Sequence, residues 1–513
     1  MKIVNSTDMA ALEREEFKAF GDHLAEVFMD RVGMALAASI EQFCSEKSSN
    51  GSLVYVLAGK GNNGGDAYHC AKVLMSLGYR VIAVEVTDQG SLSPLCRLKR
   101  EDFLRSGGRL DVFDGQESPF KRQPLLIVDG LFGTGFNGQL KGLYRELVLA
   151  ANNCEAPIFA IDIPSGISGD LGFFDGQDCI HASKTYFLEL PKLGYFLGQA
   201  WNHMGLLHRI SFGLSELAHE KAFASASLLN ASGIKRSLPK LERQRHKYQA
   251  GLLHIWAGSM GMEGAAALVC RAALRSGCGL VKLAIEAKNY PGFSNLDLEV
   301  VKVLMNRSAG LCSKENIQFL SEHFNRGDAC IIGPGLSLDM DIYAVLHELA
   351  PSLKKPLVLD ADALTIFAQN AFSLPEQTVM TPHIGELKRL LRWEGAFDLN
   401  LKSIQLCQQY VENHQVTLVV KGAPTFIFHP KTEPKVMPRG HPGMASAGTG
   451  DVLAGIIGSF LAQGLEALDA ACIATYLHGL GGELAAKELG AYSLIASDII
   501  DKLPNAFAYL DDF

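Results

Sequence analysis

The sequence lacks the features that mark several classes of protein. Its 11 cysteines are scattered and none stands in a Cys-x-x-Cys pair, which argues against a zinc ribbon or a disulfide framework. The formal net charge is -8 and neither half of the chain is a basic block, so we expect no nucleic-acid partner. No apolar run is long enough to span a bilayer, and the first residues contain no apolar segment typical of a secretion signal. We therefore expect a cytoplasmic protein with free thiols and no membrane contact.

The 513 residues contain two series of short apolar runs, separated by glycine-marked turns and helix-length segments. The first series predicts buried strands at 53–57, 81–84, 125–128 and 158–161, and the second at 252–256, 281–285, 329–332, 357–359 and 417–420. Helical periodicity predicts helices within 9–43, at 263–276 and at 451–465. This alternation is typical of parallel sheets with crossover helices, and the fold class is α/β with two tandem domains, the first a Rossmann-like open parallel sheet.

The segment 214–245 separates the two series and is polar, with helical character. We place the domain boundary near 220–230, which gives domains 1–222 and 223–513.

Polar residues follow three strands of the first series. The strand at 53–57 leads into Gly-Asn-Asn-Gly-Gly-Asp at 61–66 and then a helix, and Asp129, Asp162 and Ser165 follow two later strands. Because the carboxyl ends of parallel strands meet at one crevice, Asn63, Asp66 and these three residues are expected to face one ligand. Each Asp alone is about equally suited to cap a helix or form a turn.

The first half resembles the NAD(P)H-hydrate epimerase family, in the motifs at 28–33, 59–66, 128–135 and 162–166. The resemblance implies that Asp129 is the acid/base and that Asn63, Asp129 and Ser165 hold a potassium ion. It implies a set of residues that bind the hydrated cofactor: Asn62, Asn63, Gly64, Gly65, Asp66, Gly133, Thr134, Gly135, Phe136, Asn137, Gly138, Gln139 and Asp162. One departure is Ala67, where the family usually has glycine, so a ligand pressing on this backbone would meet a methyl group.

The second half carries a glycine-rich segment, 440–450, directly before Asp451 and an apolar helix. Free amides at a helix N-terminus bind anions, and an Asp there can take a proton from a hydroxyl that attacks phosphorus. The structural alternative is a helix cap with a flexible lead-in. Lys421 to Thr425 offer a cation and a hydroxyl at a strand end, and His383 with Glu386 stand at helical spacing, where the histidine is more often structural.

This half resembles the ADP-dependent NAD(P)H-hydrate dehydratases, which have a ribokinase-like fold, in motifs that include 333–335, 360–363, 381–386 and 448–451. The resemblance implies that the hydrate contacts Ala265, Gly335, His383 and Asp451. It implies that the adenine nucleotide contacts Lys421, Gly422, Ala423, Pro424, Thr425 and Gly450. The resemblance implies ADP as the co-substrate and Mg²⁺ as the counter-ion of its phosphates. Glu386 would interact with the ligands of this ion without binding it directly. The segment 291–300 departs from the family's usual Pro-Glu-Val-Met.

The leading hypothesis is one polypeptide with two successive activities on NADHX and NADPHX, the hydrated cofactors. A homo-oligomer is also expected. The first alternative is a ribokinase-type vitamin or sugar kinase with an unrelated N-terminal domain, which leaves Asn62 to Asp66, Asp129 and Ser165 unexplained. The second is a non-enzymatic nucleotide-sensing module, and retention of the polar site residues weighs against it.

Overall fold

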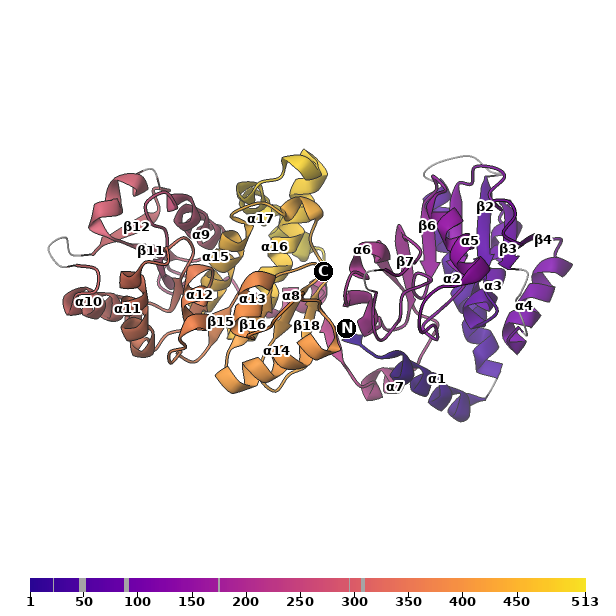
Figure 1. The fold of residues 1–513 in the computed structure, drawn as a ribbon, viewed down its shortest axis with the longest axis horizontal. Helices are drawn as coiled ribbons and strands as arrows, with labels where there is room; N and C mark the ends of the chain where they lie inside the picture. The colour runs from indigo at the N-terminus through magenta and orange to yellow at the C-terminus, as the bar shows by residue number, and fades with distance from the viewer. Residues whose placement is uncertain (22, 46–51, 87–91, 174–175, 295, 306–309) are drawn as a thin grey trace. The chain divides into compact units, whose positions relative to one another are not determined.

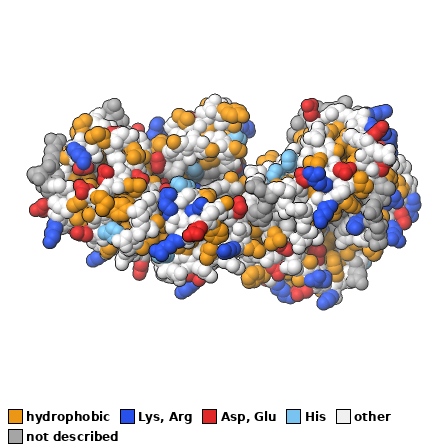
Figure 2. Space-filling view, viewed as in Figure 1, with side chains coloured by type: hydrophobic (Ala, Val, Ile, Leu, Met, Phe, Trp, Pro, Cys, Tyr) orange, Lys and Arg blue, Asp and Glu red, His pale blue; other side chains and the backbone are white. Residues whose placement is uncertain are grey.

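The protein is described by a computed structural model. It covers residues 1–21, 23–45, 52–86, 92–173, 176–294, 296–305 and 310–513. The chain divides into two compact units (Figure 1), unit 1 with Met1–Ala226 and Asp398–Leu401, and unit 2 with Ser227–Phe397 and Lys402–Phe513. Within the described ranges, no helix combines the length and the apolar character needed to cross a membrane. Acidic and basic side chains are intermixed on the face shown in Figure 2, consistent with the absence of a basic block.

Unit 1 is built on a parallel sheet in the order β4-β3-β2-β5-β6-β7-β8. Its strands are β2 (Leu53–Ala58), β3 (Arg80–Val86), β4 (Arg109–Phe113), β5 (Leu126–Gly130), β6 (Ile158–Ile161), β7 (Lys184–Leu188) and β8 (Leu206–Ile210). The central strands are buried along their length because helices cover both faces, as the continuous apolar runs predict.

The helices of unit 1 connect these strands. They are α1 (Ser6–Phe20), α2 (His23–Ser45), α3 (Asn62–Ser76), α4 (Pro94–Arg105), α5 (Gly142–Asn152), α6 (Trp201–Met204) and α7 (Glu216–Lys221), with a 3-10 turn at Leu193–Phe196 and a short strand β1 at Lys2–Ile3. Helices α2 and α3 pack in the core on one face of the sheet, and α5 packs on the other. The strand order reverses at β2 and β5, so the loops that follow these two strands border a crevice.

Unit 2 has a mixed sheet in which the order β9-β18-β17-β16-β15-β14-β13-β10-β11-β12 is parallel except at β17. Its strands are β9 (Ala226–Leu228), β10 (Leu252–Trp256), β11 (Leu280–Ile285), β12 (Val300–Leu304), β13 (Ala329–Ile332), β14 (Leu357–Leu359), β15 (Thr378–Met380), β16 (Thr417–Val420), β17 (Thr425–Phe428) and β18 (Lys435–Met437). The carboxyl ends of β10, β13, β14, β15 and β16 all lie at one edge.

Helices flank this sheet, and four of them, α9, α15, α16 and α17, share a core with its central strands. The α-helices of unit 2 are α8 (Ala231–Ser237), α9 (Glu263–Arg275), α10 (Lys314–Asn325), α11 (Met340–Leu349), α12 (Asp362–Gln369), α13 (Ile384–Leu390), α14 (Leu401–His414), α15 (Thr449–Ala462), α16 (Ala467–Leu489) and α17 (Ala496–Asp511). Short 3-10 turns occupy Ala287–Phe293, Ala350–Ser352, Pro442–Met444 and Ala491–Ser493. Helix α15 is buried along most of its length, as its apolar sequence predicts.

The predicted fold class is confirmed, and every strand predicted from an apolar run is present. The helical prediction for 214–245 is wrong in part. The segment forms two short helices, α7 and α8, with Ser215 and Asn230 as N-caps, and the strand β9 between them. Helix α8 stops before Pro239, because the residue that precedes a proline is restricted to extended backbone. A strand of three residues among polar residues is too short to leave a periodic signal.

Candidate active sites

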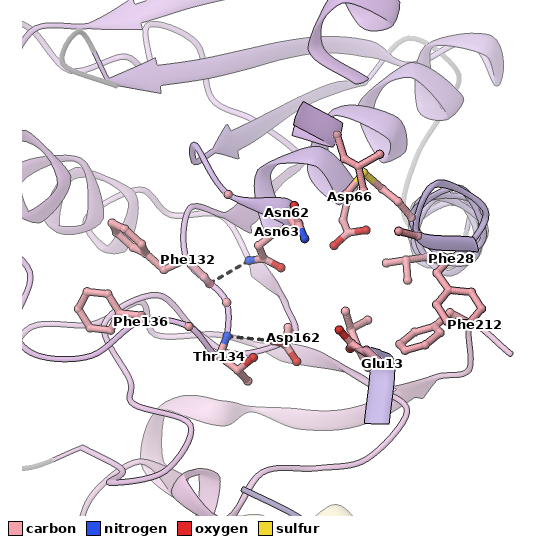
Figure 3. Close-up of a pocket in the computed structure, with 18 of the residues that line it drawn as sticks. Glu13, Phe28, Asn62, Asn63, Asp66, Phe132, Thr134, Phe136, Asp162 and Phe212 are labelled. Atoms are coloured by element: carbon pink, nitrogen blue, oxygen red, sulfur yellow. Dashed lines mark hydrogen bonds between the residues drawn. The ribbon is translucent and has the colours of Figure 1, made fainter. Parts of the chain in front are cut away.

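Unit 1 encloses a cavity of about 670 Å³ at the carboxyl ends of its central strands (Figure 3). Most of the predicted cofactor-binding residues line this cavity: Asn62, Asn63, Asp66, Gly133, Thr134, Gly135, Phe136, Asn137 and Asp162. They come from the loop that begins α3, the loop after β5 and the end of β6. The convergence predicted from three separate strand ends is therefore present.

Gly64 and Gly65, at the start of α3, allow close packing because a side chain at either position would clash with a neighbour. A Cβ atom on Gly64 would lie 2.0 Å from the carbonyl oxygen of Gly59, and one on Gly65 would lie 2.6 Å from the sulfur of Met29. Neither glycine is among the residues that line the cavity wall, so a ligand contact at either position stays a prediction. Gly138 and Gln139 are exposed and also lie outside the wall.

The departure at Ala67 has a local explanation. The residue is fully buried, and its methyl group lies against the Cα of Gly130 in β5, where an added Cβ would be only 2.5 Å away. The methyl group therefore faces the sheet and not the cavity.

Asp162 is fixed by three neighbours at the base of the cavity. Its Oδ1 accepts from Lys192 Nζ at 2.8 Å, and its Oδ2 accepts from the Thr134 amide at 3.1 Å (Figure 3). Tyr195 donates its hydroxyl to the Asp162 carbonyl at 2.7 Å, and Asp162 itself has a left-handed φ of 62°. Lys192 is only 1% exposed and was missed in the sequence, although a lone lysine within the apolar stretch 186–198 is a signal of a buried ion pair.

Three carboxyl groups face the cavity: Glu13, Asp66 and Asp162. Burial raises the pKa of Glu13 to about 7, with Lys192 opposing and Asp162 adding to the shift. Burial also raises the pKa of Asp66 well above its usual range, reinforced by the charges of Asp162 and Glu13. Both shifts favour the neutral form of the carboxyl group, and a neutral carboxyl can donate a hydrogen bond to a hydroxyl or phosphate oxygen. Glu13 was not predicted, because it comes from α1, far away in the sequence.

Asp129 and Ser165 lie beneath the cavity wall, and both are fully buried. The carboxylate of Asp129 accepts from the Ser165 hydroxyl at 2.7 Å, from the Ser165 amide at 2.8 Å and from the Leu131 amide at 3.2 Å. Burial raises the pKa of Asp129 to about 6, and the hydrogen bonds from Ser165 and Leu131 limit the shift. Neither residue is among those that line the cavity wall, so their contact with a ligand stays a prediction.

Asn63 connects this buried pair to the cavity. Its amide nitrogen donates to the carbonyls of Phe132 at 2.9 Å and Ile161 at 3.2 Å, while the Ser165 hydroxyl accepts from the Phe132 amide at 3.0 Å. Its Oδ1 atom is buried and has no hydrogen-bond partner among the described residues. A buried amide oxygen in this position can accept a hydrogen bond from a ligand or coordinate a cation.

The second site lies at the carboxyl edge of the unit 2 sheet, where α15 begins. Gly448 precedes this helix with a φ of 90°, a conformation that favours glycine, and Thr449, Gly450 and Asp451 form its first turn. The free amides of this turn and the positive end of the helix dipole favour an anion here. Burial raises the pKa of Asp451 to about 7, Asp360 adds to the shift, and Lys421 opposes it.

Lys421 is the cation of this site. Its Nζ lies 2.8 Å from Asp360 Oδ1, and the ammonium group approaches the helix start so closely that a Cβ on Gly450 would be 3.2 Å from it. Glu386 lies close by, and burial raises its pKa to about 7, with Lys421 opposing. Asp360, the first residue of the motif at 360–363, is 1% exposed and pairs with this lysine.

His383 is the N-cap of α13. Its Nδ1 accepts from the Gly385 amide at 2.9 Å, and its own amide donates to Glu386 at 2.9 Å, which completes a capping box. The structural alternative for this histidine is therefore present, while its ring, with 57% of the side chain exposed, can still meet a ligand. The predicted hydrate contacts Ala265 and Gly335 are neighbours, since a Cβ on Gly335 would lie 3.1 Å from that of Ala265.

The turn from β16 to β17 contains the predicted nucleotide contacts. Gly422 and Ala423 are exposed, whereas Pro424 is buried and the Thr425 hydroxyl donates to the Gly422 carbonyl at 3.1 Å. In the divergent segment 291–300, Phe293 is buried beneath Gly258 in the core, and residue 295 lies outside the described ranges.

His478 was missed in the sequence. It lies on α16, and its Nε2 is 2.9 Å from the carbonyl oxygen of Thr449 in the first turn of α15. Burial lowers its pKa to about 4, so the ring is neutral and donates this hydrogen bond. Because the contact spans two helices far apart in the sequence, no local pattern indicates it.

The two sites define a two-domain α/β enzyme with a carboxylate-bearing site at the strand ends of each unit. The model of the NAD(P)H-hydrate dehydratase family matches residues 253–505, and that of the YjeF-related protein N-terminus family matches residues 25–194. The bifunctional NAD(P)H-hydrate repair enzyme Nnr of Moorella thermoacetica is 32% identical over 100% of this chain and 98% of its own length. The Escherichia coli protein of the same name is 31% identical over 97% of this chain and 92% of its own length. The chain belongs to the family of bifunctional NAD(P)H-hydrate repair enzymes.

Solved structures resemble the second half. A ribokinase-like superfamily protein from Enterococcus faecalis is 29% identical with a TM-score of 0.49, covering 56% of this chain and 97% of its own. The ADP/ATP-dependent NAD(P)H-hydrate dehydratase of Bacillus subtilis, co-crystallised with ATP and Mg²⁺, is 25% identical with a TM-score of 0.48, covering 56% of this chain and 99% of its own.

Proposed function

We propose that the two halves of this repair enzyme act in succession. Residues 1–222 interconvert the R and S forms of hydrated NADH and NADPH, and residues 223–513 dehydrate the S form at the expense of ADP. Family membership over the whole chain supports the repair of these hydrates. The observation that carries the division is that each sheet has its own carboxylate-bearing site at its own strand ends.

The cavity of unit 1 suits a hydrated dinucleotide. Aromatic rings from Phe28, Phe132 and Phe136 form an apolar wall for the nicotinamide ring, and the amides at the start of α3 favour a phosphate. The raised pKa values of Glu13 and Asp66 limit repulsion of this anionic substrate.

Asp129 is the proposed acid/base that lets the C6 hydroxyl change face. Its pKa of about 6 allows both protonation states near neutral pH, which general acid–base catalysis requires. Because its carboxylate lies under the wall, protons would pass through the Ser165 hydroxyl, which donates to it at 2.7 Å.

Potassium is proposed for the same region. The unpartnered Oδ1 of Asn63, the Ser165 hydroxyl and the Asp129 carboxylate are hard oxygen donors, which fit an alkali cation. A cation held there would offset the negative charge of Asp129 and of the substrate. We expect epimerisation to be faster in potassium chloride than in sodium or choline chloride at equal ionic strength, and Asn63→Leu to remove this difference.

In unit 2, Asp451 removes the proton from the C6 hydroxyl, which attacks the terminal phosphorus of ADP and releases AMP. The amides of Gly448 to Gly450 stabilise the developing negative charge, with Lys421 beside them. The resulting phosphate ester loses inorganic phosphate and the C5 proton, and the C5–C6 double bond returns. Asp360, Asp362 and Glu386 offer the oxygen donors that suit Mg²⁺, which would neutralise phosphate charge.

The decisive test is product analysis with purified S hydrate and ADP. We expect inorganic phosphate, AMP and NADH in equal amounts. A stable phosphorylated compound without NADH would establish the kinase alternative. The cytoplasmic location and a homo-oligomeric state stay predictions from the sequence.

A further inference from the structure

A group of soft side chains lies in unit 1 outside the cavity wall. Cys179, His181 and His203 each present one ligand atom, and the three atoms all lie within 4.8 Å of one another. Cys179 is buried, His203 is half-buried and His181 is exposed. No hydrogen bond of the described residues occupies the Cys179 sulfur or the ring nitrogens of the two histidines. The three atoms are therefore free to share a ligand.

The backbone that carries Cys179 and His181 is held in place by one side chain. Asn152 donates from Nδ2 to the Cys179 carbonyl at 2.8 Å, and its Oδ1 accepts from the His181 amide at 2.9 Å. Between them, the Ile180 amide donates to the Ser165 carbonyl at 2.9 Å. These bonds fix the segment 179–181 with the side chains of its first and third residues toward His203.

His203 is fixed from the other side. It lies in α6, its carbonyl accepts from the Ala182 amide at 3.0 Å, and its amide donates to the Ala200 carbonyl at 2.9 Å. Its ring stacks on that of His181, with the ring centroids 4.6 Å apart. The rings of Phe173 and His203 pack in a T-shaped arrangement, with centroids 4.9 Å apart. Two separate segments of unit 1 therefore present these ligand atoms, and hydrogen bonds hold the backbone of both segments in place.

We propose that Cys179, His181 and His203 form a binding site for Zn²⁺. One thiolate and two imidazoles are the donor set that Zn²⁺ prefers, at about 2.3 Å for sulfur and about 2.0 Å for nitrogen. In a tetrahedral site these ligand atoms lie about 3.3–3.5 Å apart, and side-chain rotation can close the difference from 4.8 Å. Three protein ligands leave a fourth position, which faces solvent on the side of His181.

The bound ion would brace the loop that carries Ser165. The segment 179–181 runs behind this loop, where Gly166 packs so tightly that a Cβ would lie 2.8 Å from the Cα of Cys179. Zn²⁺ would join this segment to α6 and so stabilise unit 1 by binding the folded state alone.

Co²⁺ in place of Zn²⁺ reports the site directly, because four-coordinate Co²⁺ absorbs strongly in the visible and a thiolate ligand adds a charge-transfer band. Full-length protein stripped of metal should bind one Co²⁺ with both signatures, and Zn²⁺ should displace it. Cys179→Ser should remove the charge-transfer band, and His203→Ala should lower the affinity by at least about 10-fold, since even outer-sphere changes cost about 10–100-fold. Cys154→Ser and His23→Ala, which alter the same residue types outside the cluster, should change neither.

A second readout does not depend on colour. Zn²⁺ should raise the thermal midpoint of the wild type and of Cys154→Ser but not of Cys179→Ser. Weak binding without the thiolate band, or binding that survives both Cys179→Ser and His203→Ala, would overturn the proposal.

Discussion

Replacement of Asp451 by Asn tests the chemistry of unit 2 through rate and stability together. Loss of a positioned general base costs roughly 10²–10⁴ in rate, so ADP-dependent formation of NADH from the S hydrate should fall by that factor. In the wild type the acid limb of the pH–rate profile should have its midpoint near 7, because burial and Asp360 raise the pKa of Asp451 to about 7. Asp501→Asn, which alters an exposed carboxylate of the same unit, should retain full activity.

The same variant should be more stable than the wild type at alkaline pH. The pKa of Asp451 is raised on folding, so the native state favours the protonated carboxyl, and this stability is lost as the pH rises through about 7. A shift of three units corresponds to at most about 4 kcal/mol, and solvent access to this half-buried group reduces it to about 1–2 kcal/mol. Asn is always neutral, so the gain in thermal midpoint should be a few degrees at pH 8 and absent below pH 4. Near wild-type turnover in a folded variant, or a destabilisation equal at both pH values, would refute this role of Asp451.

Two further substitutions probe the neighbours of the catalytic groups. Asp360→Asn should move the midpoint of the acid limb of the dehydratase pH–rate profile below 7. The negative charge that raises the pKa of Asp451 is lost, and Lys421, no longer paired with Asp360, lowers that pKa further. An upward shift of this midpoint in kcat/KM would contradict the ion-pair geometry. Lys192→Met should lower the free energy of unfolding in urea by about 3–5 kcal/mol, because Asp162 becomes an unpaired buried charge, and Asp162→Asn in the same chain should restore part of it. Equal stability of the single and double variants would show that the pair is not coupled.

The elements and strand-end residues were predictable because they depend on local patterns. A buried strand followed by a glycine-rich turn indicates the crevice of an open sheet, and this placed Asn63 and Asp162 correctly at the cavity. The sequence also indicates that Asp129 ends a strand. It does not indicate that this carboxylate is fully buried, because its burial depends on how the loops after two strands pack together, as in the hydrogen bond from the Phe132 amide to the Ser165 hydroxyl.

The residues that were missed enter the sites from distant elements. Glu13 lies on α1 and His478 lies on α16, which packs against α15. Neither residue is therefore near a sequence motif. His383 illustrates the opposite case, since a motif position proved to be a helix cap as well as a candidate contact. Local spacing determines a cap and a loop, whereas a cavity wall depends on how whole elements pack.

The most direct test of two successive activities uses the wild-type protein and purified R hydrate alone. Without nucleotide, the S hydrate should appear while no NADH forms. When ADP and Mg²⁺ are then added, NADH and inorganic phosphate should form until the R hydrate is consumed. Chiral chromatography and NADH absorbance measure both stages in one sample. If ADP yields NADH from the R hydrate although no S hydrate appears in its absence, the proposed division between the two halves is contradicted.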